Sequence, residues 1–120
     1  MNVLVVDDDR VQLETLRRGL RSKGYHVFEA LDGNEALKNL LLAASNRIDL
    51  VLSDYVMPGM NGIQLLKEIR RDYRSMPVIL MTAFGERDLV IEALRNRCDG
   101  FIEKPFTLDQ LVEEIERVIH

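Results

Sequence analysis

Five short apolar runs alternate with five longer stretches of helical periodicity, and this alternation limits the possible folds more than any other feature. The runs rich in β-branched or aliphatic residues are Asn2–Val6, His26–Glu29, Leu50–Ser53, Val78–Met81 and Gly100–Glu103. The first, third and fourth are almost wholly apolar, which is typical of strands buried on both faces. The pattern therefore predicts a (βα)5 chain with a parallel sheet and right-handed crossovers.

The stretches between these runs place aliphatic residues three and four positions apart, which is the spacing of one helix face. The residues predicted to face the core are Leu13, Leu16 and Leu20; Ala36, Leu37, Leu40 and Leu41; Ile63, Leu66 and Ile69; Leu89, Ile91, Ala93 and Leu94; and Leu108, Leu111, Val112, Ile115, Val118 and Ile119. Each group supplies one helix, so every predicted strand is followed by a helix that can cross back over the sheet.

Residues typical of helix ends stand at several of the predicted boundaries. Asp9 precedes the first helical stretch and Thr107 precedes the last, where short polar side chains cap backbone N–H groups. Gln110, three residues after Thr107, completes the pattern of a capping box. Gly24 follows the first helix, and Asn96 is expected to adopt a left-handed conformation at the end of the fourth.

The length of the chain selects an open sheet. A closed barrel of alternating strands and helices needs about 250 residues, whereas this chain has 120. Hydrophobic residues make up 47% of the sequence and charged residues 30%, as is typical of a globular protein. We therefore expect residues 1–120 to form one α/β domain with a doubly wound parallel sheet. In such sheets, ligands bind at the carboxyl ends of the strands.

Charge and cysteine content argue against several classes of protein. The net charge of -4 argues against a surface that binds nucleic acid directly. No apolar run in the sequence approaches the roughly 18 residues that a membrane-spanning helix needs. Cys98 is the only cysteine, so no internal disulfide is possible, and a reducing, cytoplasmic location is expected.

Acidic, hydroxyl and basic residues stand where four of the predicted strands end. They are Asp7, Asp8 and Asp9 after the first strand, Asp54 after the third, Thr82 and Ala83 after the fourth, and Lys104 after the fifth. Clustered carboxylates repel one another, and a hard divalent cation such as Mg2+ relieves this repulsion through oxygen ligands. A lysine can hold phosphate oxygens, and a carboxylate facing such a group can become an aspartyl-phosphate. The set therefore predicts a magnesium site with room for a phosphoryl group.

Each of these residues also has an ordinary structural interpretation when it is taken alone. The three consecutive aspartates could simply favour the positive end of the first helix dipole, and capping or solvent exposure is the role expected for Asp9. Lys104 alone would be a surface lysine, and Thr82 alone would be a residue at the end of a strand. The functional interpretation depends on all of them meeting at one edge of the sheet.

Four separated motifs resemble the receiver (CheY-like) domains of two-component response regulators. These motifs are Val3–Asp9, Asp54 with Met57–Gly62, Met81–Ala83, and Lys104–Phe106. The resemblance covers the whole chain, and the motifs stand in the family's order. It implies a flavodoxin-like sandwich with a parallel five-stranded sheet of order 2-1-3-4-5.

The resemblance also implies which residues hold the acceptor and the metal. Asp54 is similar to the phosphoacceptor of the family, which becomes 4-aspartylphosphate. Asp8 and Asp54 would bind Mg2+ through their carboxylates and Val56 through its backbone carbonyl. Asp7 would hold a metal-bound water. Such chemistry depends chiefly on positioning and on neutralising charge.

Further residues are similar to those that bind the phosphoryl group and respond to it. Lys104 would pair with the phosphoryl oxygens, and Thr82 and the backbone N–H of Ala83 would receive them after transfer. Thr82 and Phe101 would then shift together, although Phe101 could equally be an ordinary core residue. The chain would be a phosphorylation-controlled switch, which catalyses only its own phosphotransfer and dephosphorylation, and not an enzyme with separate substrates.

The partners implied by the resemblance are a sensor histidine kinase or phosphotransfer domain as donor and an output domain or effector as target. The face that regulates the output would combine the fourth predicted helix, the strand Gly100–Glu103 and the last helix. The same face could form a dimer, so both a monomer and such a dimer are compatible with the sequence.

Two positions depart from the polar residues that family members often use to speed dephosphorylation. Val56 and Phe84 are apolar, so neither side chain can orient a water molecule by hydrogen bonding. We therefore expect the phosphoryl group to persist longer than in family members that turn over rapidly.

Three other functions share parts of this pattern. A phosphatase of the haloacid dehalogenase type also uses an aspartyl-phosphate, but it requires a second acid at the position of Val56. A flavin- or dinucleotide-binding module needs a glycine- or hydroxyl-rich loop where the acidic segment Asp7–Arg10 stands. The alternative that stays open is a phosphorylation-independent, receiver-like protein interaction module.

Overall fold

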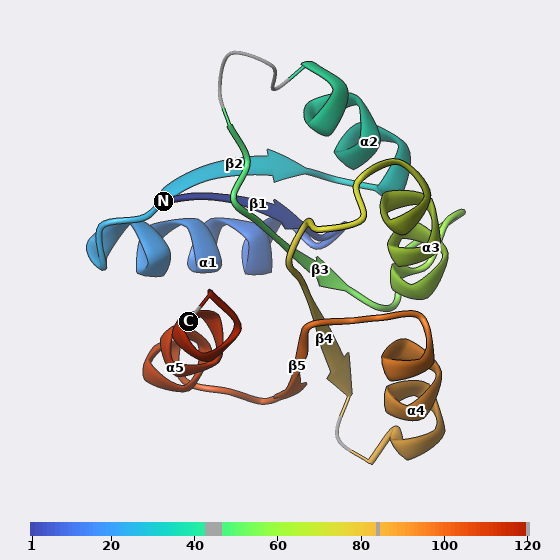
Figure 1. Cartoon of the computed structure of the whole chain (residues 1–120). Coiled ribbons are helices and arrows are strands. Elements are labelled where there is room, and N and C mark those ends of the chain that lie inside the picture. Colours follow the sequence, from blue (N-terminus) through green and yellow to red (C-terminus); the bar gives the residue numbers. More distant parts are fainter. Residues whose placement is uncertain (43–46, 84, 120) are drawn as a thin grey trace.

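The computed structural model describes residues 1–42, 47–83 and 85–119, in which five strands alternate with five helices. Their arrangement in space is shown in Figure 1. The strands are β1 (Asn2–Val6), β2 (His26–Ala30), β3 (Leu50–Asp54), β4 (Val78–Ala83) and β5 (Gly100–Lys104). The helices are α1 (Arg10–Ser22), α2 (Gly33–Leu42), α3 (Gly62–Asp72), α4 (Arg87–Arg95) and α5 (Leu108–Ile119). All strand pairings are parallel, in the order β2-β1-β3-β4-β5. The predicted fold class and strand order are therefore confirmed.

Four strands are longer at their carboxyl ends than the apolar runs predicted. β2 continues to Ala30, β3 to Asp54, β4 to Ala83 and β5 to Lys104. The sheet register explains the extension, because Asp54 lies opposite Met81, and Ala83 lies opposite Lys104. The polar residues at these ends therefore belong to the hydrogen-bonded ladder, which fixes the directions of their side chains.

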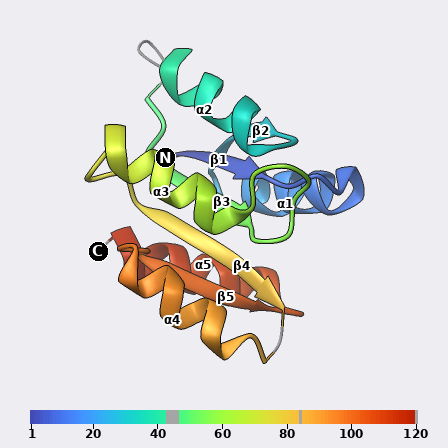
Figure 2. The same cartoon turned by 90° about the vertical axis from the view of Figure 1, so that its right-hand side faces the viewer.

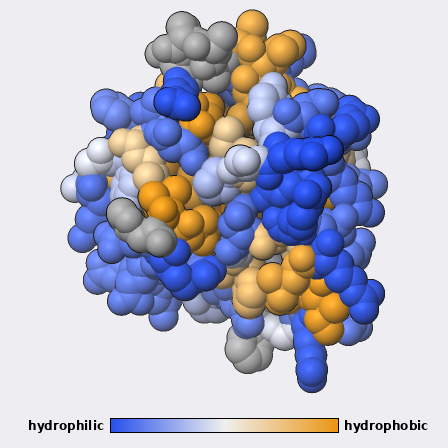
Figure 3. Space-filling model, in the orientation of Figure 1, coloured by the Kyte–Doolittle hydropathy of each residue, from blue (hydrophilic) through white to orange (hydrophobic). Residues whose placement is uncertain are grey.

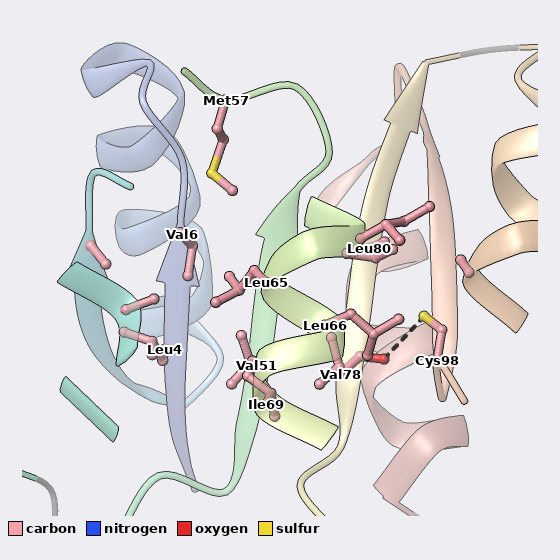
Figure 4. Close-up of a cluster of buried hydrophobic side chains, with 14 of the residues drawn as sticks. Leu4, Val6, Val51, Met57, Leu65, Leu66, Ile69, Val78, Leu80 and Cys98 are labelled. Carbon is pink, nitrogen blue, oxygen red and sulfur yellow. Dashed lines mark hydrogen bonds between the residues drawn. The ribbon is translucent and has the colours of Figure 1, made fainter. Parts of the chain in front are cut away.

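The helices form two layers, one on each face of the sheet. In Figure 2, α2, α3 and α4 lie in front of the sheet and α1 and α5 lie behind it. Side chains of the central strands alternate between two buried clusters: Leu4, Val51 and Leu80 face α2, α3 and α4, whereas Val5 and Leu52 face α1 and α5. Figure 4 shows the first cluster around α3. Burial on both faces explains why these strands are almost wholly apolar.

The predicted helix faces are mostly correct. Leu13, Leu16 and Leu20 of α1 and Ile63, Leu66 and Ile69 of α3 are buried. The predictions for Leu41, Ile91 and Leu94 are wrong, because their exposed fractions are 72%, 40% and 53%. α2 and α4 each cover the sheet along a narrower stripe, in which Ala36 and Leu40 or Leu89 and Ala93 are buried. An apolar area over α4 is visible in Figure 3.

Two predicted caps are confirmed. Asp9 accepts hydrogen bonds from the backbone N–H groups of Val11 and Gln12 at the start of α1. At α5, the Gln110 N–H donates to Thr107 Oγ1 at 3.1 Å, and the Thr107 N–H donates to Gln110 Oε1 at 2.9 Å. The two bonds form the predicted capping box.

The prediction that Asn96 is left-handed is wrong. Its φ is -93°, and the left-handed residue is Arg97, with a φ of 63°. Cys98 N–H donates to the Ala93 carbonyl and Arg97 N–H donates to the Leu94 carbonyl, both at 3.0 Å, which is the Schellman arrangement. Asn96 is therefore the C-cap residue of α4, and the left-handed turn is formed by the next residue, Arg97.

No helix within the described part of the chain is both long and apolar enough to span a membrane.

Candidate functional site

Three aspartates meet at the carboxyl edge of the sheet. Asp7 follows β1 and Asp54 ends β3, which are neighbouring strands, and Asp8 begins the loop that leads to α1. One carboxylate oxygen from each residue lies within 4.8 Å of the other two. Asp7 and Asp54 are buried, with exposed fractions of 0% and 8%, while Asp8 is exposed. The sheet topology thus brings together the three acids that the sequence predicted.

Asp7 is held in place on one side only. Its Oδ1 accepts a hydrogen bond of 2.9 Å from the backbone N–H of Asp9. Its Oδ2 is buried and has no hydrogen-bond partner in the described part of the chain. Burial raises the pKa of Asp7 from 3.8 to about 6, and the Asp54 charge adds to this, while the Asp9 N–H and Lys104 act in the opposite direction.

The acid cluster fits a hard divalent cation. Its donors are carboxylate oxygens, which Mg2+ prefers, and the buried Oδ2 of Asp7 lacks a partner that an ion with its bound water would supply. Val56, two residues after Asp54, exposes 66% of its surface, so its side chain is directed to solvent and only its backbone is available to the site. The residues present are therefore compatible with Mg2+.

Lys104, the last residue of β5, reaches across to the acid cluster. Its Nζ lies 3.0 Å from Oδ1 of Asp54. It also donates a hydrogen bond of 3.2 Å to Oε1 of Gln12 on α1. The ammonium is thus held between a carboxylate and an amide, and part of the Asp54 charge is offset.

Gln12 is the site residue that the sequence analysis did not identify. A weak indication was present in the sequence, because Gln12 lies in the first turn of α1, directly after the acidic segment that follows β1. Glutamine is common on exposed helix faces, however, and only the position of Lys104 distinguishes this one.

Thr82 and Ala83 end β4, between the strands that carry Asp54 and Lys104. The Thr82 side chain is buried, with 1% exposed, and its Oγ1 has no hydrogen-bond partner in the parts of the chain that the structure describes. A buried hydroxyl without a partner is costly and uncommon. Ala83, by contrast, is exposed. The next residue, Phe84, lies outside the described residues.

The loop after Asp54 depends on two glycines. Gly59 has a φ of 76°, which favours glycine. Gly62 begins α3 and donates its N–H to the Tyr55 carbonyl at 2.8 Å. A Cβ on Gly62 would lie 2.7 Å from the Asp54 carbonyl oxygen, so only glycine fits there without moving the backbone. Met57, two residues before Gly59 in the same loop, is buried in the core (Figure 4).

Phe101 lies on the same face of the sheet as Thr82. It is the second residue of β5 and pairs with Leu80, while Thr82 pairs with Glu103. Side chains two positions apart share a face, and this face is the one covered by α3 and α4. Phe101 is half-buried. The geometry is compatible both with a packing role and with movement towards Thr82.

The chain matches the family described as "Response regulator receiver domain" over residues 3–116. It is 39% identical to the chemotaxis protein CheY of Pseudomonas aeruginosa, over 98% of this chain and 95% of that protein. It is also 39% identical to the DNA-binding transcriptional regulator NtrC of Salmonella typhimurium, over 98% of this chain but only 24% of the regulator. The chain therefore spans nearly all of one relative and a small part of another.

The fold has close counterparts among solved structures. A response regulator receiver domain protein from Clostridium thermocellum superimposes with a TM-score of 0.91 and 30% identity. The alignment covers 98% of this chain and 93% of that one. The likeness therefore extends over the sheet and the helices on both of its faces.

Proposed function

The chain belongs to the response regulator receiver domain family, whose members are signalling switches, and we propose that it accepts a phosphoryl group on Asp54. The observation that carries this proposal is the meeting of three carboxylates with Lys104, whose Nζ lies 3.0 Å from Asp54 Oδ1. In this proposal, residues 1–120 form one receiver domain. Its donor is a phosphohistidine on a sensor histidine kinase or a phosphotransfer domain.

In the transfer step, an Asp54 carboxylate oxygen forms a bond to phosphorus. The bond between phosphorus and the histidine nitrogen breaks, and its electron pair returns to the imidazole ring. Lys104 then exchanges the Asp54 carboxylate for an oxygen of the phosphoryl group, since it already lies within hydrogen-bonding distance. Gln12 keeps the ammonium close to the site during this exchange.

The same site would hold Mg2+ through the carboxylates of Asp8 and Asp54, the backbone carbonyl of Val56, and Asp7 by way of a water. When bound, Mg2+ supplies positive charge that offsets the carboxylates and the phosphoryl oxygens. The clustered oxygens and the raised pKa of Asp7 support this assignment.

Thr82, Ala83 and Phe101 would respond to phosphorylation. Thr82 Oγ1 has no hydrogen-bond partner among the described residues, so the gain from binding a phosphoryl oxygen is large, and the Ala83 N–H would bind another. As Thr82 moves towards Asp54, Phe101 fills the space behind it on the same sheet face. The α4–β5–α5 surface, where Ile91 and Leu94 are exposed, would change with it and contact an output domain, an effector or a second copy.

The test is phosphorylation with a small acyl phosphate and Mg2+, followed by intact mass spectrometry, with Asp54→Asn alongside. Gain of one phosphoryl group by the wild type alone would support the proposal. Gain by both proteins would place the acceptor elsewhere. If neither protein gains mass, even with a histidine kinase as donor, the chain is a phosphorylation-independent interaction module.

A further inference from the structure

Six basic side chains surround a cavity of about 430 Å3 at the far end of the molecule from Asp54. α3 starts beside Asp54, where Gly62 contacts the Tyr55 carbonyl, and it runs back along the sheet, so its last turn lies at the opposite edge. The ends of α3 and α4 and the segments that follow them supply the lining. We call this site the basic groove; its charged residues are Lys67, Arg70, Arg71, Arg74, Arg95 and Arg97.

Arg70 forms the rigid floor of the basic groove. Its guanidinium is buried, with 6% exposed, and it donates to the backbone carbonyls of Met76 and Arg97 at distances of 2.6 to 3.0 Å. It also forms an ion pair with Asp99 at 2.5 Å, and Asp99 in turn accepts from the Val78 N–H at 2.8 Å. These bonds tie the segments after α3 and α4 together, so the cations on the rim are held around one cavity.

The five basic residues around Arg70, which form the rim of the basic groove, carry positive charge that is mostly not neutralised by ion pairs with described residues. Arg71 pairs with Glu68 and Asp72, but within the described ranges no ion pair forms at Lys67, Arg74, Arg95 or Arg97, all of which are exposed. This concentration of positive charge occurs on a chain whose net charge is -4. Figure 3 shows strongly hydrophilic residues over the end of α3, beside the apolar surface of α4.

Helix dipoles account for only part of this cluster. A cation in the last turn of a helix is stabilised by the negative end of the dipole, which explains Arg71 and Arg95. Lys67 lies before the last turn of α3, and Arg74 and Arg97 lie beyond the two helices. Like charges held close together repel, so the remaining cations reduce the stability of the free protein.

The backbone conformation of Arg97 also lowers the stability of the protein at the basic groove. Its φ of 63° lies in the left-handed region, where glycine is strongly favoured. A non-glycine residue in this conformation is uncommon and strained. The chain therefore places an arginine, whose side chain faces the basic groove, at a turn that glycine would stabilise.

We propose that the basic groove binds a small molecule that carries two or more phosphate groups. Guanidinium groups match phosphate oxygens through paired, charge-assisted hydrogen bonds, and the cavity has the size of a small-ligand site. Among the described residues, none of those that line the groove is aromatic, so binding is through phosphates and not through a stacked base. Its lining is confined to the ends of two helices, which favours a compact polyanion over an extended nucleic acid or acidic protein.

Titration with inorganic triphosphate tests this proposal, with calorimetry for affinity and amide NMR shifts for location. The buffer contains EDTA and no Mg2+, and its ionic strength is about 0.15 M, where distant surface charges are screened. The test variant is Arg95→Gln with Arg97→Gly. Because Gly relieves the left-handed strain at position 97, this variant should stay folded. The matched control is Arg21→Gln with Lys38→Gln, which removes the same charge, including one last-turn arginine, from other helices.

We expect saturable binding by the wild type and the control, with amide shifts at Asn96 and Arg97. The groove variant should bind about tenfold more weakly or worse, because charge-assisted bonds are lost. Equal affinity of the wild type and the groove variant, or equal loss in the control, would overturn the proposal. So would failure to bind triphosphate, or tighter binding of a poly-glutamate peptide or of single-stranded DNA at the same amides. Asp54→Asn should bind normally, which separates this site from the phosphoacceptor.

Discussion

The ammonium of Lys104 lies 3.0 Å from Oδ1 of Asp54, although β4 separates the two strands that carry them. The lysine therefore spans the end of β4, where the buried hydroxyl of Thr82 has no partner in the described part of the chain. The Lys104 ammonium and the Thr82 hydroxyl, which can both bind an anion, thus lie beside the proposed acceptor in the unphosphorylated protein. This arrangement makes the contribution of each group separately measurable.

Gln12→Leu should slow phosphorylation of Asp54 by a small acyl phosphate about two- to tenfold, because the net contribution of a hydrogen bond is roughly 0.5–1.5 kcal/mol. The change removes the acceptor that holds Lys104 at 3.2 Å and keeps the side-chain volume. The initial rate from intact mass spectrometry is the measurement. Thr15→Val, a similar change one turn further along α1, should react like the wild type; equal slowing in both variants would contradict a positioning role for Gln12.

The stability of the metal-free protein should fall as pH rises through the titration of Asp7. Burial raises its folded-state pKa from 3.8 to about 6, so the folded state binds more protons than the unfolded state between these values. The stability contributed by protonated Asp7 is complete below pH 3.8 and is lost as pH rises through about 6. At pH 7.5, Asp7→Asn should therefore be more stable than the wild type, by on the order of 1–3 kcal/mol.

Urea unfolding of both proteins between pH 5 and pH 7.5, in EDTA, measures this difference. The gap between them should narrow towards the acidic end, because Asp7 then carries its own proton. Added Mg2+ should stabilise the wild type at pH 7.5 more than Asp7→Asn, since ligand binding to the folded state raises its stability. A constant gap at all pH values would show that Asp7 does not titrate in this range.

Thr82→Val should stabilise the unphosphorylated protein by about 1 kcal/mol while impairing the switch. The substitution keeps the shape of the side chain and removes a buried hydroxyl that has no described partner. Thermal unfolding without donor measures the first effect, and the change in amide NMR shifts of α4 and β5 on phosphorylation measures the second. A loss of stability would mean that the hydroxyl already has a hydrogen-bond partner, such as an ordered water.

Gly62→Ala should destabilise the protein by about 1–3 kcal/mol, because the added Cβ meets backbone atoms that cannot move independently. It would lie 2.7 Å from the Asp54 carbonyl oxygen and 2.9 Å from the Tyr55 Cα. The displacement reaches the acceptor itself, so phosphorylation should slow as well. Gly24→Ala is the control, because its φ of 92° is also unfavourable for a side chain, while a Cβ there would meet no described atom within 4 Å apart from its chain neighbours. It should lose stability but phosphorylate normally.

Most of the fold follows from periodicity, and most of the site follows from topology. Once the sheet was predicted to be parallel, Asp7, Asp54, Thr82 and Lys104 had to share its carboxyl edge. Periodicity does not determine the width of the stripe that each helix buries, so Leu41 and Leu94 were wrongly assigned to the core. That width depends on how each helix sits on the sheet, which is a tertiary property.

Single-residue conformations and long side-chain contacts were the least predictable features. Asn is the commoner left-handed residue, yet the hydrogen bonds of Cys98 and Arg97 move the turn past Asn96. The contact between Lys104 and Gln12 joins residues 92 positions apart, so no local pattern indicates it. From the sequence, Arg70 cannot be distinguished from the exposed arginines near it. In the structure, its guanidinium is buried under the segments that follow α3 and α4.

Val56→Asn should shorten the lifetime of the phosphoryl group several-fold. Val56 follows the proposed acceptor by two residues and exposes 66% of its surface, so an amide there can orient a water towards phosphorus, which valine cannot do. Decay is measured by intact mass spectrometry after the donor is removed, with Mg2+ present. Val11→Asn, at a valine of α1 with 75% exposure, is the matched control and should decay like the wild type. A lifetime equal to or longer than that of the wild type would show that Val56 does not slow hydrolysis.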